Sequence, residues 1–252
     1  MKRKIISLVC LFALVLSVFT ACTKGAAANN EKTSDPKSSA VLSAYIVEAN
    51  KKTKTLLVSS NDGLLFVSAD NAVVEKDGKT LSYEDLKPGM TVKIGYDGSV
   101  LESYPGQISN IETIKVVSQE DDKISLFKEM FIHIYENREK LEDETTIALD
   151  FTKITSLSKE QKAALFYVLG NYFSTKTEAD VIESSYEELK KHGRLKDEYS
   201  FPGGIILSVG ENEDGTFSGS WWKSGLCASG FNCTAKMKNG EWKINYGEFW
   251  IS

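Results

Sequence analysis

The sequence predicts a mixed fold: a small β-barrel domain over residues 40–118, then an α+β domain over residues 120–252 with helices packed on an antiparallel sheet. Two observations carry this prediction. Short strand patterns separated by Gly, Asp and Asn turn signals fill the first stretch, and helical periodicity begins near Asp121. A third observation, an apolar stretch at the start, places a signal peptide at residues 1–21 and a flexible tether at residues 22–39.

The opening segment has the three parts of a secretory signal. Lys2, Arg3 and Lys4 precede an apolar run over 5–19, and the small residues Thr20 and Ala21 follow it. The run is shorter than the ~20 residues that a membrane-spanning helix needs. We therefore expect export across the membrane.

The stretch Phe-Thr-Ala-Cys, residues 19–22, resembles a lipobox, the bacterial lipoprotein motif, although Leu is usual where Phe19 stands. The resemblance implies that Cys22 is acylated and anchors the protein to the extracytoplasmic face of the cell membrane. An ordinary secretory signal and an uncleaved anchor are the alternatives. The polar, aperiodic stretch after Cys22 suits a tether, with a root-mean-square reach of roughly 20–25 Å.

The charge of the exported part argues against nucleic acid as a partner. The signal holds three of the 30 basic residues and none of the 35 acidic ones, which leaves 27 against 35, a formal charge of −8. Nucleic acid and anionic lipid both repel such a chain. Membrane association is then expected to come from the lipid alone, and we expect a monomer.

Residues 40–118 read as short strands joined by tight turns. Asn61–Gly63 and Asp77–Gly78 are hairpin signals, a single helical turn is expected near Tyr83, and Asp97–Gly98 indicates a further hairpin. Several short strands at this spacing favour a small closed or nearly closed barrel.

This stretch resembles the OB-fold-like domains of unknown function in lipoproteins of low-GC Gram-positive bacteria. The resemblance rests on residues that include Asp85, Leu86, Gly89, Val92, Tyr96, Gly98, Glu102, Ser103, Tyr104, Pro105 and Ile108. It implies a fold and a cell-envelope setting but no activity. Tyr104 is either a ligand contact or, as Pro105 suggests, part of a structural turn at a strand end.

Residues 120–252 begin with helices and end in strands. Asp121 or Asp122 is expected to cap a first helix, while Ser158 with Gln161 and Ser185 with Glu188 have capping-box spacing. The helix after Ser185 is expected to end at His192–Gly193. Asp214–Gly215 and Asn239–Gly240 predict hairpins in the strand-rich remainder. The C-terminal stretch also resembles uncharacterised domains of other Gram-positive extracytoplasmic proteins.

Two cysteines, Cys227 and Cys233, remain in the folded part. Outside the cytoplasm such a pair is a disulfide candidate, and the alternative is two thiols whose side chains point apart. With only His133 and His192 as histidines, a Cys/His zinc site cannot be assembled.

The sequence carries no recognisable catalytic motif or cofactor fingerprint. His133 and His192 both read as structural, so we expect no cofactor and no enzyme. A carboxylate pair for hydrolysis remains open because Asp and Glu are abundant.

Aromatic residues are the candidates for a binding surface. Adjacent Trp221 and Trp222 must point to opposite faces of a strand, and Trp242, Tyr246 and Trp250 follow in the same predicted sheet. We expect a module that binds a cell-envelope protein or polymer. A carboxylate-based envelope hydrolase and an inhibitor or assembly factor of a secreted peptidase are the alternatives.

Overall fold

The computed structural model describes residues 39–138 and 144–251 and shows a mixed, sheet-rich fold with two sheets and few helices. The predicted signal peptide, Cys22 and most of the tether lie outside the described residues. Residues 36–252 group by their contacts into one compact unit. The predicted division near residue 119 falls between the two sheets, and that division stays a prediction.

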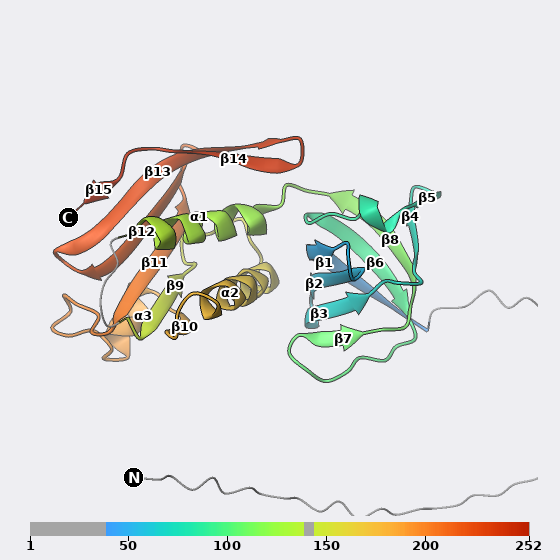
Figure 1. The fold of residues 1–252 in the computed structure, drawn as a ribbon, viewed down its shortest axis with the longest axis horizontal. Helices are drawn as coiled ribbons and strands as arrows, with labels where there is room; N and C mark the ends of the chain where they lie inside the picture. Colours follow the sequence, from blue (N-terminus) through green and yellow to red (C-terminus); the bar gives the residue numbers. More distant parts are fainter. Residues whose placement is uncertain (1–38, 139–143, 252) are drawn as a thin grey trace, which may run out of the picture. The chain divides into compact units, whose positions relative to one another are not determined.

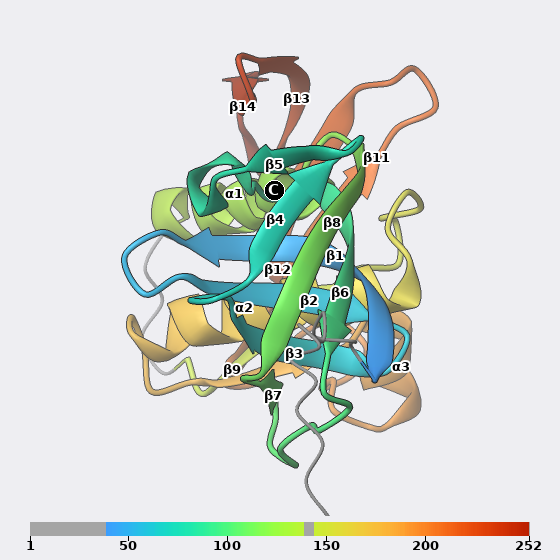
Figure 2. The same ribbon diagram turned by 90° about the vertical axis from the view of Figure 1, so that its right-hand side faces the viewer.

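The first sheet has eight strands in the order β5-β4-β8-β6-β1-β2-β3-β7. In Figure 2 its strands β4, β8 and β6 cross β1, β2 and β3 steeply, so the sheet is strongly coiled. In chain order its elements are β1 (Ala40–Asn50), β2 (Thr55–Ser60), β3 (Gly63–Ser68), β4 (Val73–Lys76), β5 (Lys79–Leu81), the 3-10 turn η1 (Tyr83–Asp85), β6 (Met90–Tyr96), β7 (Gly106–Ile108) and β8 (Ile111–Gln119).

Turn chemistry places most of these strands. Asp62–Gly63 closes the β2–β3 hairpin, and Asp77 and Gly78 take the positive φ angles of 50° and 75° that the β4–β5 turn requires. The hairpin expected after Asp97 is wrong, because Leu101 makes only an isolated bridge to Gln107. A buried cluster that includes Ile46, Val58 and Ile94 forms the core of this sheet.

The second sheet runs β10-β9-β11-β12-β13-β14, with β15 beside β13 (Figure 1). Its elements are α1 (Lys123–Asn137), β9 (Thr146–Asp150), α2 (Lys159–Ser174), β10 (Asp180–Glu183), α3 (Tyr186–Lys191), β11 (Gly204–Glu211), β12 (Phe217–Ser224), β13 (Cys227–Lys238), β14 (Glu241–Tyr246) and β15 (Trp250–Ile251).

The helix caps follow the predictions. Asp122 accepts from the backbone N–H of Ser125, and Ser158 and Ser185 each form the predicted capping box. The α3 helix ends at His192, with Gly193 at a φ of 65°. These three helix starts and this end are confirmed.

The expectation of a purely antiparallel second sheet is wrong. The strands β10 and β11 both pair with β9 in parallel, whereas β11 to β14 and the β13–β15 pair are antiparallel. The cause is the connectivity, since α2 and α3 are crossovers and a crossover returns the chain in the same direction. A sheet that mixes both kinds of pairing results.

One face of the second sheet packs on α1 and α2. Phe127 and Phe131 from α1, Leu165 from α2 and Leu207 from β11 are fully buried in one cluster. Tyr45 from the first sheet belongs to the same cluster, so side chains of that sheet reach this core. We call the opposite face of the second sheet the outer face. Leu189 of α3 packs on part of it, against Ala148 and Ile206, and the rest is left for contacts with solvent or a ligand.

Candidate functional site

The outer face follows from the alternation of side chains along each strand. On β11, Leu207 and Val209 enter the core beneath α1 and α2, so Ile206 and Ser208 point the other way. On β12, Trp221 enters that core, which places Ser220 and Trp222 on the outer face. Trp222 and Ile206 accordingly pack in a separate small cluster with Leu189 of α3.

Strand register aligns residues of five strands into one line across the outer face. Asp150 on β9 pairs with Ser208, Ser208 with Ser220, Ser220 with Gly230, and Gly230 with Trp250. We call these five residues the cross-strand row. Neighbouring strands lie about 4.8 Å apart, so the row is roughly 19 Å long. Ser218 and Asn232 form a second polar pair beside it.

Asp150 is held in place at one end of the row. Its Oδ1 accepts from the backbone N–H and the hydroxyl of Thr152 at 2.9 and 2.6 Å, and its Oδ2 accepts from the Ser208 hydroxyl at 3.3 Å. The Ser220 hydroxyl and the Asn232 amide make no hydrogen bond to the protein within residues 39–138 and 144–251. These two groups are therefore available to a ligand.

Two indoles lie on the outer face, Trp250 at the end of the row and Trp222 beside its middle. Trp250 is 49% exposed, and its Cζ2 lies 2.6 Å from the position that a Cβ on Gly230 would take, so the ring covers that glycine. The hydroxyl of Ser229 donates to the Trp250 carbonyl at 2.7 Å. Trp222 is half-buried and meets Tyr186 edge-on, with ring centroids 5.3 Å apart. Flat apolar rings thus lie beside free hydroxyl and amide groups.

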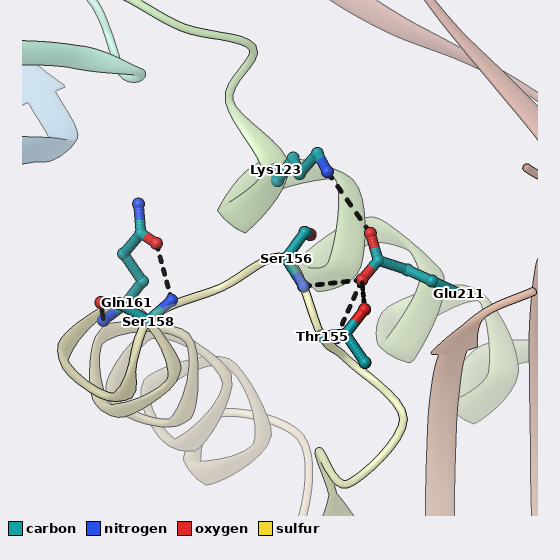
Figure 3. Close-up of polar contacts among 6 residues, drawn as sticks. All are labelled: Lys123, Thr155, Ser156, Ser158, Gln161 and Glu211. Carbon is teal, nitrogen blue, oxygen red and sulfur yellow. Dashed lines mark hydrogen bonds and ion pairs between the residues drawn. The ribbon is translucent and has the colours of Figure 1, made fainter.

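The loop after β9, which follows Asp150, is fixed on the helix side of the second sheet. Figure 3 shows Glu211, at the end of β11, holding it: Oε2 accepts from the backbone N–H groups of Thr155 and Ser156, each at 2.8 Å. Lys123 of α1 pairs with the other carboxylate oxygen at 3.4 Å. Burial by itself raises the pKa of Glu211, but the hydrogen bonds from Ser156 and Thr155 outweigh it and lower the pKa to about 2.

The six aromatic residues expected to form a binding surface do not lie together. Trp221 is buried in the core, 5% exposed, so its assignment to a surface is wrong. Trp242 packs on the helix side and donates from Nε1 to the Asp122 carbonyl at 2.7 Å. Tyr246 stacks on His133, which also takes it away from the outer face.

Tyr104 is 71% exposed but belongs to the loop before β7, where it meets Tyr167 of α2 edge-on. Of the predicted set, the outer face brings together only Trp222 and Trp250. Asp150, Ser208, Ser220 and Asn232 were missed. The polar residues that alternate with the core positions of β11 and β12 are the signal that points to them.

Of the two alternatives for Cys227 and Cys233, the structure has the one without a disulfide, because both are free thiols. They lie on the same strand, β13, with extended backbone between them. At about 3.3 Å a residue their Cα atoms are roughly 20 Å apart, against the 7 Å that a disulfide tolerates. Burial raises the pKa of Cys233 to about 11, so this thiol is protonated at neutral pH.

Two cavities bear on the alternative functions. One of about 140 Å³ is lined by Asp150, Glu183 and Glu188. Asp150 is already hydrogen-bonded to Thr152 and Ser208, and Glu188 accepts from the Ser185 backbone N–H in its capping box. Two of the three carboxylates thus serve the fold, which does not favour a hydrolytic pair.

The second cavity, of about 800 Å³, is lined by Trp242 and by residues around the start of α1. Burial raises the pKa of Asp122, and burial with the Asp122 charge raises that of Glu129. Asp122 serves as the cap of α1, and the wall carries both acids and lysines, so its chemistry selects no ligand class.

Neither a family model, nor a curated protein, nor a solved structure matches this chain. Within the described part of the chain, no helix is long and apolar enough to cross a membrane. The same residues contain no group of three or more His, Cys, Asp or Glu side chains arranged to hold a metal ion.

Proposed function

We propose that this protein is an extracytoplasmic lipoprotein, anchored by a lipid on Cys22, that binds a polysaccharide of the cell envelope without catalysis. The observation that carries the binding proposal is the cross-strand row, where the Asp150 carboxylate and the Ser208 and Ser220 hydroxyls run toward the exposed indole of Trp250.

The chemistry of the row fits a sugar chain. Sugar rings have an apolar face that packs on a flat aromatic ring, and hydroxyls that exchange hydrogen bonds with carboxylate, hydroxyl and amide groups. An extended, shallow line of such groups suits a linear polymer better than a small metabolite, which needs a deep pocket. Protein interfaces, in contrast, have an apolar core, and the centre of this row is polar.

The proposal includes an OB-like barrel for residues 40–118. The strong coiling of the first sheet and its short strands with tight turns support this finer description. Its part in the function is to form a folded body near the membrane, since the acidic chain disfavours nucleic acid. We propose that the protein acts as a monomer.

Binding to purified cell-wall polysaccharide tests the proposal, with Trp250→Ala as the decisive variant. Removing an exposed indole that stacks on the ligand is expected to weaken binding at least tenfold, the loss typical of a central contact. Ser220→Ala is expected to weaken it severalfold. Tyr104→Ala is the matched control, because Tyr104 is an exposed aromatic outside the outer face. Equal affinity of wild type and Trp250→Ala would overturn the proposal.

The lipid anchor has its own test. Metabolic labelling with a radioactive fatty acid is expected to label the wild-type protein and leave Cys22→Ala unlabelled, because the thiol of Cys22 is the proposed acceptor. Cys227→Ala removes a cysteine of the folded part and should label normally. Label on Cys22→Ala at the wild-type level would show that the anchor is elsewhere.

A further inference from the structure

The last described residues, 247–251, form a strap that follows the end of β14 at Tyr246. The Gly247 N–H donates to the Asn232 carbonyl at 2.8 Å, and β15 pairs with β13 only at Ser229 and Gly230. Ile251 is 85% exposed. The Ser229 hydroxyl and the Trp250 ring over Gly230 hold the strap on β13, and the side chains of Tyr246 and Phe249 hold its start and middle against α1.

Those contacts converge on one histidine of α1. The His133 and Tyr246 rings are stacked, with centroids 3.6 Å apart and planes 9° apart. Phe249 lies against the same imidazole at 5.8 Å, and Phe231 of β13 meets it edge-on at 5.4 Å. The strap is thus docked on an imidazole enclosed by three aromatic rings.

The hydrogen bonds of Asn137 assign the proton on this imidazole. Its Nδ2 donates to the His133 backbone carbonyl at 2.9 Å, which fixes the amide orientation, and the same nitrogen lies 3.2 Å from His133 Nδ1. Nδ1 is therefore an acceptor, and the neutral ring carries its proton on Nε2. That Nε2 is buried and has no hydrogen-bond partner among the described residues.

Protonation is incompatible with this arrangement. A second N–H, on Nδ1, would point at the Asn137 NH2 group, which is itself a donor. The new charge would lie among aromatic rings with Nε2 cut off from water. Burial accordingly lowers the pKa of His133 from its ordinary value of 6.5, and the nearby Glu136 charge offsets this only in part.

The other titratable groups around the stack do not replace the missing acceptor. Glu136 of α1 accepts from the Tyr172 hydroxyl and pairs with Lys176 at 3.8 Å. Burial raises the pKa of both Tyr246 and Cys233, so these groups stay neutral at pH values near the histidine transition. Glu129 lies one turn before His133 on α1 and acts on Tyr246 through its charge, and Glu248 on the strap is exposed.

We infer that protonation of His133 releases the strap, so that Trp250 leaves the outer face in mildly acidic surroundings. The docked state has the lower proton affinity, so its stability is complete above pH 6.5 and falls as the pH drops below that value. Release of the strap does not depend on the proposed function. Its consequence, weaker polysaccharide binding in acid, does rest on it.

Hydrogen exchange of the full-length protein at pH 7.5 and 5.5, corrected for intrinsic rates, tests the inference. At pH 5.5 we expect the amides of residues 247–251 to lose protection severalfold and at most about tenfold, the limit set by an undocked pKa of 6.5. In His133→Phe, which keeps an aromatic ring but cannot be protonated, protection should be the same at both pH values. His192→Phe changes the other histidine, the exposed C-cap of α3, and should behave like the wild type.

Protection of the strap at pH 5.5 in the wild type would overturn the inference, as would an equal loss in His133→Phe. Should His133→Phe fold poorly, NMR titration of the wild-type imidazole decides: a His133 pKa at or above 6.5 contradicts the mechanism. A strap that loses protection at pH 5.5 while Trp250→Ala binds polysaccharide normally would uphold the switch and refute the proposed function.

Discussion

Replacing Glu144 with alanine is expected to lower the free energy of unfolding by about 3–5 kcal/mol, the cost typical of breaking a buried ion pair from one side. Glu144 pairs with Arg138, and the two side chains are only 8% and 6% exposed. Arg138 also donates to the Tyr135 carbonyl at 2.7 Å, and its guanidinium lies 3.9 Å from the centre of the Tyr135 ring. These contacts keep the cation in place after its partner is removed, so its charge stays buried and unpaired.

Urea unfolding of Glu144→Ala measures the loss in free energy of unfolding, and two controls show whether burial of the ion pair causes it. The double variant Arg138→Met/Glu144→Leu removes both charges and should recover most of the stability, because apolar groups of similar size replace a desolvated pair. Lys243→Ala breaks a pair that is 62% and 74% exposed and should cost less than about 1 kcal/mol. A cost for Glu144→Ala as small as that of Lys243→Ala would contradict the burial of the pair.

Helix boundaries were predictable because their determinants are local. The capping partners Ser158 and Gln161 are three residues apart, and so are Ser185 and Glu188, so the sequence displays both ends of each interaction. The tight turn at Asp77–Gly78 was predictable for the same reason. The hairpin expected after Asp97 does not form, although the same kind of turn signal precedes it, since Leu101 makes only a single bridge.

The candidate site could not be predicted because it depends on pairing between strands that are far apart in the sequence. The cross-strand row collects side chains from Asp150 to Trp250, and their alignment depends on the parallel pairing of β9 with β11 and on the return of the chain at β15. Neither feature has a local signal. Trp221 and Trp222 lie on opposite faces as predicted, but the aromatic residues alone did not show which of the two rings is in the core.

The cysteine pair shows how spacing misleads. Five intervening residues suggest a small loop, and the glycine within them favours a turn, but residues 227–238 form one continuous strand. Pairing with β12 on one side and with β14 and β15 on the other keeps that strand extended. The neighbours that hold β13 straight are therefore what separates the two thiols.

Replacing Glu211 with glutamine is expected to destabilise the protein at neutral pH by about 3 kcal/mol, from the difference between its ordinary pKa of 4.5 and its folded value of about 2. The side chain is 17% exposed, so water screens the carboxylate only weakly. A glutamine oxygen can still accept from the Thr155 and Ser156 N–H groups, but a neutral acceptor makes weaker bonds. It also loses the ion pair with Lys123.

The same pKa fixes how stability depends on pH. A carboxyl whose pKa is lowered by folding contributes fully above its unfolded value, so the contribution of Glu211 is complete above about pH 4.5 and is lost as the pH falls toward 2. Unfolding free energies of wild type and Glu211→Gln should therefore differ most at pH 7 and converge near pH 2. Glu213→Gln changes an exposed neighbour and is the control, because its free energy of unfolding should stay close to that of the wild type at both pH values. A constant difference between pH 7 and pH 2 would mean that the Glu211 charge does not hold the loop that follows Asp150.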